Sequence, residues 1–360
     1  ALGIVVCTDE IRSDAADTIA YFERERVTTK VISGDNPRTV AAIARRCGIR
    51  DADRWIDARD LPTDPEVLGE DAADIAVFGR VTPEVKRSLV KAAQQRGEVI
   101  AMTGDGVNDT LALKDADLGI AMGAGTSAAR SVAEIVLLDN RFATLPGVVA
   151  EGRRVIANIE RVARLFVTKT VWAATFAVIV GVVTASYPIL PRQLTVIDSI
   201  TIGIPAFVLS FRPSHEPARP GFIRRVLSFS VPIGIIIGVT GMTTFGLARS
   251  DLVGLDRAGA QSIATLVLTG LGLVALHELM RPLDVVEAGL LAVLTAMAVS
   301  AFTIPFVAEF FLLERPGGDD AVLAAAAIVA GGSAIVVANR NSAAITAAAS
   351  RIRDRAIRSR

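Results

Sequence analysis

Two short polar turns in the first third of the chain carry residues suited to binding phosphate and a metal ion. One reads Ser33-Gly34-Asp35, and the other reads Thr103-Gly104-Asp105-Gly106-Val107-Asn108-Asp109. Glycine lets backbone N–H groups approach an anion closely, and the hydroxyl groups and the ammonium group of Lys86 suit phosphate oxygens. Asp105 and Asp109 suit Mg²⁺, which takes one or two carboxylates together with phosphate. These residues predict phosphoryl transfer by positioning and charge neutralisation.

The segments around these turns alternate between strand and helix patterns. Proline at the first helical position predicts helices from Pro37 and Pro83, and Gly48 predicts the end of the first of these helices. Five short apolar runs predict strands, namely Val31–Ile32, Val77–Val81, Val99–Met102, Leu118–Ala121 and Ile135–Leu138. This alternation predicts an α/β domain with a parallel, Rossmann-like sheet, whose ligands bind at the carboxyl ends of the strands.

The second half of the chain has a different composition, with long apolar runs. Over all 360 residues, 51% are hydrophobic and the mean hydropathy is +0.48, which excludes a disordered chain. Six runs of about 18–23 residues are long enough to cross a hydrocarbon core of about 30 Å, and buried helices of a soluble core are the alternative. They are Leu165–Tyr187, Leu194–Phe211, Val226–Ala248, Gln261–Met280, Val285–Phe306 and Ala321–Ala338. We therefore expect an all-α domain of six transmembrane helices in a lipid bilayer.

Charge in the connecting segments predicts the orientation of these helices. Arginines are frequent before the first run, after the second and after the sixth, whereas the segment after the fifth is mostly acidic. Because arginine-rich loops stay in the cytoplasm, we expect a multi-pass protein of the cell membrane with both termini cytoplasmic. The 38 basic residues balance the 38 acidic ones, so the net charge of zero gives no argument for a nucleic-acid partner.

The run from Thr103 to Gly123, TGDGVNDTLALKDADLGIAMG, resembles the hinge signature of P-type cation-transporting ATPases. That family belongs to the haloacid-dehalogenase-like superfamily. The similarity continues through Gly125-Thr126-Ser127 and through Glu151–Val162, which resembles the entry into the family's fifth membrane helix. Gln193–Ala206 matches the pattern of the sixth. The resemblance implies a partial phosphorylation domain over 1–147, a stalk helix over 148–164, six membrane helices over 165–339 and a basic cytoplasmic tail over 340–360.

The resemblance also implies roles for residues around the phosphate. Ser33 matches a phosphate-binding hydroxyl, Lys86 matches the lysine that neutralises the phosphoryl group, and Asp105 matches the Mg²⁺ ligand. Asn108 and Asp109 match the residues that complete the shell around magnesium and phosphate.

A further set matches positions that bind the cofactors, ATP and Mg²⁺. Arg80 matches an arginine near the nucleotide ribose, and Gly34 and Asp35 match the same nucleotide-side loop. The remaining members lie in the second turn and are Thr103, Gly104 and Gly106.

The family's nucleophile, an aspartate in an Asp-Lys-Thr-Gly-Thr motif, does not occur in this sequence. The chain therefore resembles the carboxyl-terminal half of a pump, and we expect it to need the amino-terminal half, covalently or in trans, to form an aspartyl-phosphate. The strand that carries this motif is missing too, which predicts an open sheet edge. Two alternatives remain: a membrane-tethered phosphatase of the same superfamily, and a non-catalytic membrane fragment or partner of a split or truncated pump.

One acidic residue lies within the first two apolar runs. Between Leu165 and Phe211 the only acid is Asp198, with Thr201 one helical turn further on. Because an acid in a membrane span is costly and usually functional, we expect Asp198 and Thr201 to bind the transported cation; an acid that packs helices together is the alternative. Lys169 is expected to extend to the cytoplasmic surface, or else to pair with Asp198 and stand in for a bound cation. The sequence does not name the ion.

Overall fold

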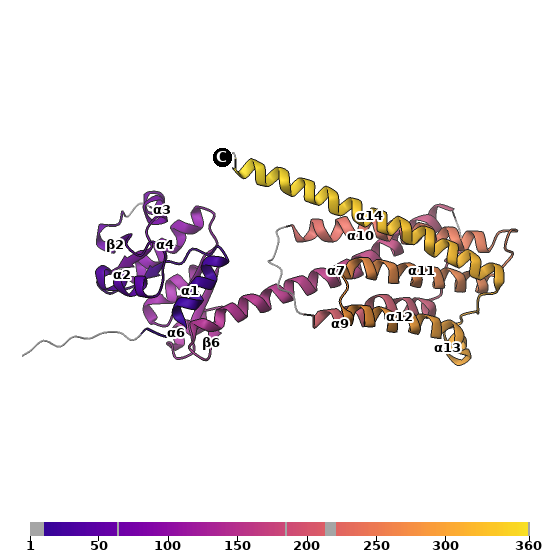
Figure 1. Cartoon of the computed structure of the whole chain (residues 1–360), viewed down its shortest axis with the longest axis horizontal. Coiled ribbons are helices and arrows are strands. Elements are labelled where there is room, and N and C mark those ends of the chain that lie inside the picture. Colours follow the sequence, from indigo (N-terminus) through magenta and orange to yellow (C-terminus); the bar gives the residue numbers. More distant parts are fainter. Residues whose placement is uncertain (1–10, 63–64, 184–185, 213–220, 359–360) are drawn as a thin grey trace, which may run out of the picture. The chain divides into compact units, whose positions relative to one another are not determined.

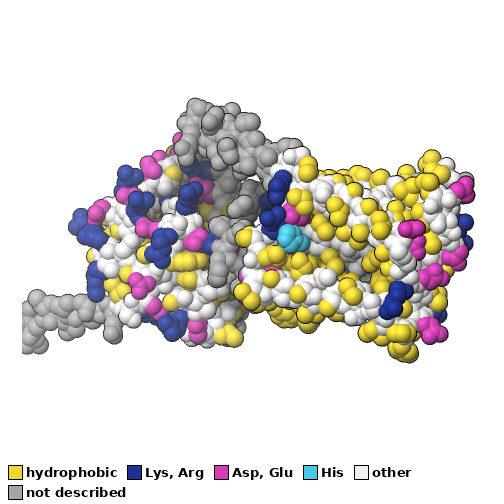
Figure 2. Space-filling view, turned by 45° about the vertical axis from the view of Figure 1, so that its right-hand side comes forward, with side chains coloured by type: hydrophobic (Ala, Val, Ile, Leu, Met, Phe, Trp, Pro, Cys, Tyr) yellow, Lys and Arg dark blue, Asp and Glu magenta, His cyan; other side chains and the backbone are white. Residues whose placement is uncertain are grey.

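The computed structural model describes residues 11–62, 65–183, 186–212 and 221–358, without the side chains of residues 65–66 and 342–358. The chain divides into two compact units, residues 1–150 and 151–360 (Figure 1). Figure 2 shows charged side chains over much of the first unit and hydrophobic ones over most of the helices of the second. This difference matches the change in composition along the sequence.

The first unit alternates short strands with helices. Its elements are α1 (Ala15–Arg24), β1 (Val31–Ile32), α2 (Pro37–Arg46), β2 (Trp55–Asp57), η1 (Ala58–Asp60), α3 (Pro65–Ala73), β3 (Val77–Gly79), α4 (Pro83–Gln95), β4 (Ala101–Gly104), η2 (Val107–Asp109), α5 (Thr110–Asp115), β5 (Leu118–Met122), α6 (Ser127–Val132), β6 (Ile135–Leu137) and η3 (Phe142–Thr144). The five predicted strands are present, and β2 is an additional one. The predicted α/β class with parallel pairing is confirmed.

The strands form two parallel sheets where a single sheet was expected. One has the order β1-β3-β2 and the other the order β4-β5-β6. Val31 and Trp55 both pair with Val77 in the first sheet, and Ala101 pairs with Leu118 in the second. Each sheet therefore ends in open edges within the described part of the chain, and the edge strands β1 and β4 are those that lead into the two polar turns.

Helix α4 packs against both sheets of this unit. Leu89 belongs to the apolar cluster around Phe78 of β3, while the neighbouring Val90 belongs to the cluster around Met102 of β4. Thr82 caps the helix by accepting a hydrogen bond from Val85 N, and proline follows it at the first helical position. Burial of each such aliphatic side chain stabilises the fold by about 1.5–3 kcal/mol. The helix that carries Lys86 is therefore fixed to β3 and to β4.

In the described part of the second unit, all regular elements are helices. Its elements are α7 (Leu145–Val183), α8 (Pro191–Asp198), the π-helical turn η4 (Ser199–Gly203), α9 (Ile204–Ser210), α10 (Phe222–Ala248), α11 (Arg257–Met280), α12 (Val285–Thr303), α13 (Pro305–Phe311) and α14 (Gly318–Arg358). Helix α7 begins at Leu145, before the division between the units.

Six helical segments in the described part of the chain are long and apolar enough to cross a membrane, as predicted. They are Phe142–Val183, Pro191–Ser210, Phe222–Ala248, Arg257–Met280, Val285–Thr303 and Gly318–Asn341. Helix α11 contributes most to the shared core, with Leu268, Leu271 and Leu276 fully buried.

Glycines allow α10 to lie close against α7. A β-carbon placed on Gly234 would be 2.6 Å from Cβ of Val171, and one on Gly238 would be 2.7 Å from Cβ of Thr175. Small residues at such positions let helix backbones approach, which is how helices associate in the absence of a hydrophobic driving force in lipid. The part of α7 that follows Leu165 therefore packs closely against α10.

Candidate functional site

The turn after β4 is organised around the buried carboxylate of Asp109. Oδ2 of this carboxylate accepts a hydrogen bond from Gly106 N at 3.2 Å, and the backbone N–H of Asp109 donates to the carbonyl of Gly106 at 3.1 Å. A β-carbon on Gly104 would lie 2.6 Å from Cβ of Asp109, so only glycine leaves room for the carboxylate. Thr126 N donates to the carbonyl of Asp105 at 2.8 Å, which ties the turn to the segment before α6.

Lys86 reaches this turn from the first turn of α4. Its ammonium Nζ lies 2.6 Å from Oδ1 of Asp109, and the two side chains are only 12% and 11% exposed. The pair joins α4 to the carboxyl end of β4, where a parallel sheet binds its ligands. The structure therefore brings together two residues that are 23 positions apart in the sequence.

Asp105 and Asn108 are exposed beside this pair. The Asp105 carboxylate makes no hydrogen bond or ion pair with any other described residue, so it is available to a ligand. The described residues contain no cluster of three or more acidic, histidine or cysteine side chains that could enclose a metal ion. Asp105 and Asp109 alone fit Mg²⁺, because that ion keeps water and phosphate in most of its coordination positions.

The Ser33-Gly34-Asp35 turn follows β1. Ser33 N donates to the carbonyl of Phe78, and the Ser33 carbonyl accepts from Val81 N, so the turn lies beside the end of β3. The Ser33 hydroxyl accepts a hydrogen bond from Asp35 N at 3.2 Å and lies 3.3 Å from the Asp35 carboxylate. Among the described residues, no hydrogen bond or ion pair joins this turn to Lys86 or Asp109. Ser33 is therefore at the carboxyl end of its sheet, and none of the hydrogen bonds or ion pairs of the described residues joins it to the other turn.

Arg80 is held by an acid that the sequence analysis did not single out. Arg80 Nη1 lies 2.6 Å from Oδ2 of Asp57, and Arg59 binds both oxygens of that carboxylate through Nε at 2.9 Å and Nη2 at 2.8 Å. Hydrogen bonds first from Arg59 and then from Arg80 hold the pKa of Asp57 well below its usual range. Arg80 N also donates to the carbonyl of Asp35 at 2.8 Å. The backbone of Arg80 thus lies beside the Ser33 turn, while its guanidinium is held at the carboxyl end of β2.

In the membrane unit, Lys169 of α7 pairs with Asp198 of α8, with Nζ 2.5 Å from Oδ2. The expected extension of Lys169 to the surface is therefore wrong, and the alternative of pairing is confirmed. The carboxylate holds the ammonium by direct Coulombic attraction, and among the described residues no other acid pairs with Lys169. Asp198 is the last residue of α8, and the π-helical turn η4 follows it directly.

Thr201 has different neighbours from Asp198. Its hydroxyl donates to the carbonyl of Ile197 at 2.8 Å, and a β-carbon on Gly272 of α11 would be 2.5 Å from its methyl group. The wider π-helical turn changes the angle between residues three positions apart, so the shared face expected for a regular helix does not follow. Thr201 keeps a free acceptor lone pair, and its role in cation binding stays a prediction.

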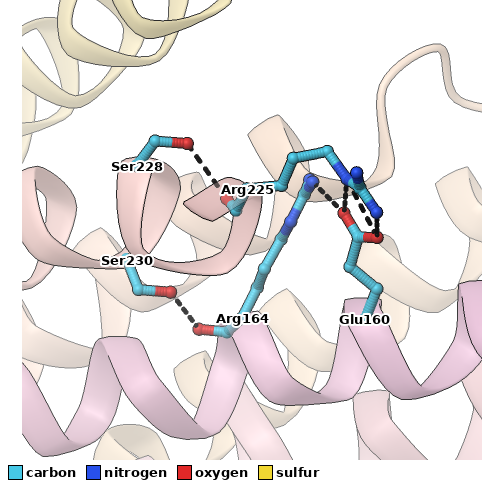
Figure 3. A network of polar contacts seen from close by, with 5 residues as sticks. All are labelled: Glu160, Arg164, Arg225, Ser228 and Ser230. Atoms are coloured by element: carbon cyan, nitrogen blue, oxygen red, sulfur yellow. Dashed lines mark hydrogen bonds and ion pairs between the residues drawn. The ribbon is translucent and has the colours of Figure 1, made fainter. Parts of the chain in front are cut away.

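A half-buried network of ion pairs joins α7 to α10 near the start of the apolar part of α7 (Figure 3). Glu160 accepts hydrogen bonds from Arg225 Nε at 3.0 Å and Nη2 at 2.7 Å, and from Arg164 Nη2 at 2.5 Å. Ser230 donates to the carbonyl of Arg164 at 2.9 Å. Together with the glycine contacts described above, this network fixes α7 against α10 over several helical turns.

Comparison with known proteins gives one family and several relatives. The haloacid dehalogenase-like hydrolase family model matches residues 1–117. The calcium-transporting ATPase CtpE of Mycolicibacterium smegmatis is 44% identical over 323 residues, which are 86% of this chain and 41% of that protein. The probable cation-transporting ATPase exp7 of Streptococcus pneumoniae is 37% identical over 259 residues, which are 69% of this chain and 33% of that protein.

A third relative, the calcium-transporting ATPase of Bacillus subtilis, is 31% identical over 283 residues, or 75% of this chain and 32% of that protein. The chain thus spans less than half the length of each of these relatives. Because each relative matches at least 69% of this chain, the matched residues include parts of both the α/β unit and the helical unit. The chain belongs to the P-type cation-transporting ATPases of the haloacid-dehalogenase-like superfamily.

Proposed function

We propose that this chain is the carboxyl-terminal portion of an ATP-driven cation pump. In this proposal, Mg²⁺-dependent phosphoryl transfer passes through an aspartyl-phosphate whose aspartate lies outside the chain, and it drives a cation across the cell membrane. The observation that carries the proposal is the buried pair of Lys86 and Asp109 at the carboxyl end of β4, next to the unpaired carboxylate of Asp105.

Each residue of this group has a chemical role in the proposal. The Lys86 ammonium neutralises charge on the transferring phosphoryl group, and Asp109 holds that ammonium in place. Asp105 and Asp109 hold Mg²⁺, which supplies charge neutralisation when bound, and the amide of Asn108 completes the shell. The Ser33 hydroxyl donates a hydrogen bond to a phosphate oxygen.

The nucleotide-side residues are proposed to bind ATP. Arg80, oriented by Asp57, donates to the ribose, and the backbone of the two glycine-containing turns approaches the phosphates. The residues of these turns are Gly34, Asp35, Thr103, Gly104 and Gly106.

Among the described strands, β1 and β4 each lie at the edge of a sheet, which supports a role for further residues of the protein in completing the site. Each of these edge strands leads into one of the two polar turns, and an unpaired strand edge presents backbone donors and acceptors to another strand. We infer that a strand carrying the nucleophilic aspartate pairs with these edges. The aspartate then lies near Lys86, between two turns that no hydrogen bond or ion pair of the described residues joins.

The membrane unit is proposed to carry the cation at Asp198 and Thr201, with both termini in the cytoplasm. Helix α7 is continuous from Leu145 to Val183, and a continuous helix transmits a displacement at one end to side chains along its length. Because two of the three relatives are named as calcium-transporting, Ca²⁺ is the first cation to test.

The experiment uses radiolabelled ATP with Mg²⁺. The 360-residue chain alone is expected to show no acid-stable, hydroxylamine-labile label, and the amino-terminal portion of the Mycolicibacterium relative supplied in trans should acquire one. Asp109→Asn in this chain should prevent that labelling, and Asp319→Asn, an exposed acid in the first turn of α14, is the control. Labelling that is indifferent to Asp109→Asn contradicts the proposal.

The two alternatives have distinct outcomes in the same preparation. A membrane-tethered phosphatase would hydrolyse p-nitrophenyl phosphate with the chain alone. A non-catalytic fragment or partner would give neither hydrolysis nor labelling under any combination.

A further inference from the structure

A cavity of about 400 Å³ lies between α7 and the end of α9 in the helical unit, and we call it the α7–α9 cavity. Its polar lining comes from Arg154 and Asn158 of α7 and from Ser210, the last residue of α9. Its apolar lining comes from four further residues of α7, namely Val155, Ile159, Val162 and Ala163. Because polar and apolar groups line it together, and because cavities of about 300–1,000 Å³ bind small molecules, it suits an amphipathic ligand.

The side-chain amide of Asn158 has an unused oxygen in this cavity. Asn158 is only 6% exposed, and its Nδ2 donates to the carbonyls of Ser210 at 2.7 Å and of Arg212 at 3.2 Å. These two bonds fix the orientation of the amide. Oδ1 is buried and accepts no hydrogen bond from any described residue. A buried acceptor without a donor is costly, so the cavity calls for a ligand that donates a hydrogen bond.

Two guanidinium groups on the same side of α7 also have unused donors. Nε of Arg154 and Nη1 of Arg161 are buried, and neither donates to any described residue. Arg161 follows Arg154 by seven residues, which is close to two turns of a helix. Glu151, which pairs with Arg154, has a side chain that is 54% exposed, so it compensates this charge only weakly. The positive charge that remains calls for an anionic ligand.

The position of the cavity along α7 indicates that this ligand is a lipid. Ala163 lies two residues before Leu165, where the first apolar run begins and α7 enters the membrane. Phe207 and Phe211, which flank Ser210 in the sequence, are 68% and 64% exposed, and their rings meet edge to face with centroids 5.2 Å apart. Exposed aromatic rings at this depth offer a surface to acyl chains. A molecule with an anionic, hydrogen-bonding end and an apolar end is an anionic phospholipid.

We propose that the α7–α9 cavity binds the headgroup of an anionic phospholipid that carries hydroxyl groups, such as phosphatidylglycerol. The phosphate accepts hydrogen bonds from Arg154 and Arg161, and a glycerol hydroxyl donates to Oδ1 of Asn158. The ammonium of phosphatidylethanolamine is also a donor, but the two guanidinium groups repel it. Because Asn158 already joins α7 to the end of α9, the bound lipid strengthens the link between these helices. This inference goes beyond the proposed function, since it requires a lipid bilayer but neither ATP nor the amino-terminal portion of the pump.

The first test compares headgroups on the unsubstituted 360-residue chain in dodecyl maltoside, with bound lipid counted by native mass spectrometry. Phosphatidylglycerol should bind at least about fivefold more tightly than phosphatidylmethanol, which has the same charge but no headgroup hydroxyl for Asn158. Phosphatidylcholine, a lipid without net charge, gives the background. Glycerol phosphate, which has no acyl chains, should not displace the lipid at equal concentration. Equal affinity for the two anionic lipids, or displacement by glycerol phosphate, overturns the proposal.

The second test uses substitutions in the cavity. Arg154→Met removes one positive charge and should weaken the binding of phosphatidylglycerol about tenfold, and Ala163→Phe, which puts a ring into the cavity, should abolish saturable binding. The matched control is Arg249→Met, which removes an exposed arginine beyond the other end of α10 and should leave binding unchanged. In a Trp55→Phe background, the fluorescence of Trp172, buried on α7, reports whether each variant retains its fold. Unchanged affinity in both folded cavity variants overturns the proposal.

Discussion

The pair of Lys86 and Asp109 leads to a prediction about the stability of the α/β unit. Lys86→Met leaves the Asp109 carboxylate with one donor, Gly106 N, while Asp109→Asn leaves the ammonium without a counter-charge. Both side chains are nearly nine-tenths buried. Each single substitution should therefore lower the free energy of unfolding by about 3 kcal/mol, the lower end of the range for breaking a buried pair. The double variant should lose about 2 kcal/mol less than the sum of the two, because it strands no charge.

The assay is urea denaturation followed by the fluorescence of Trp55. The chain has only two tryptophans, so a Trp172→Phe background leaves one reporter, on β2 of the first unit. The control is the exposed pair of Arg96 and Glu98, 3.6 Å apart and 41% and 48% exposed, for which double substitution by glutamine should give a coupling of at most about 0.5 kcal/mol. Effects of Lys86→Met and Asp109→Asn that add to within about 0.5 kcal/mol would refute the reasoning.

Three further predictions concern close contacts and pH. Gly104→Ala puts a methyl group 2.6 Å from the β-carbon of Asp109 and should lower the free energy of unfolding, measured by urea denaturation, by about 1–3 kcal/mol. Gly106→Ala should lower it by less, because the nearest neighbour of the added methyl group is 3.5 Å away. Because folding lowers the pKa of Asp57, its contribution to stability is present above about pH 4 and is lost as the pH falls further. Asp57→Asn should accordingly lose less stability than the unsubstituted chain between pH 6 and pH 3. Gly234→Leu, directed at a valine 2.6 Å away on α7, should lower the thermal stability of the membrane unit in nanodiscs, while Gly246→Leu, with open space around it, should not.

Local sequence patterns were sufficient for most of the fold. In lipid, the backbone N–H and C=O groups of a long apolar run must bond to each other, and a helix allows this within the run itself. The six candidate spans therefore followed from length and hydropathy. Proline at the start of α2 and α4, and Gly48 with its positive φ of 82° after α2, have local effects that do not depend on the rest of the chain. The strand β2 was missed because it is only three residues long and lies among charged residues, where no periodic pattern can develop.

In the candidate sites, too, some features could be predicted from neighbouring residues in the sequence, and others depend on contacts between distant segments. The turn Thr103–Asp109 is a contiguous motif, and its glycines, hydroxyl and carboxylates indicated its chemistry directly. The anchoring of Arg80 by Asp57 joins the last residue of β2 to the residue that follows β3, and no pattern in the sequence connects them. The orientation of Thr201 depends on a π-helical turn, whose extra residue per turn depends on packing against α11 as well as on local preference.

By itself, the sequence determined which segments lie in lipid, which residue types gather at the strand ends, and the family to which the chain belongs. Only the tertiary structure decided that Lys169 meets Asp198 and that the described strands form two sheets, with β1 and β4 at their edges. The physical reason is the distance along the sequence over which each interaction acts. Hydropathy, turn chemistry and helix capping act within a few residues, whereas ion pairs and sheet edges depend on which distant segments the packed core brings together.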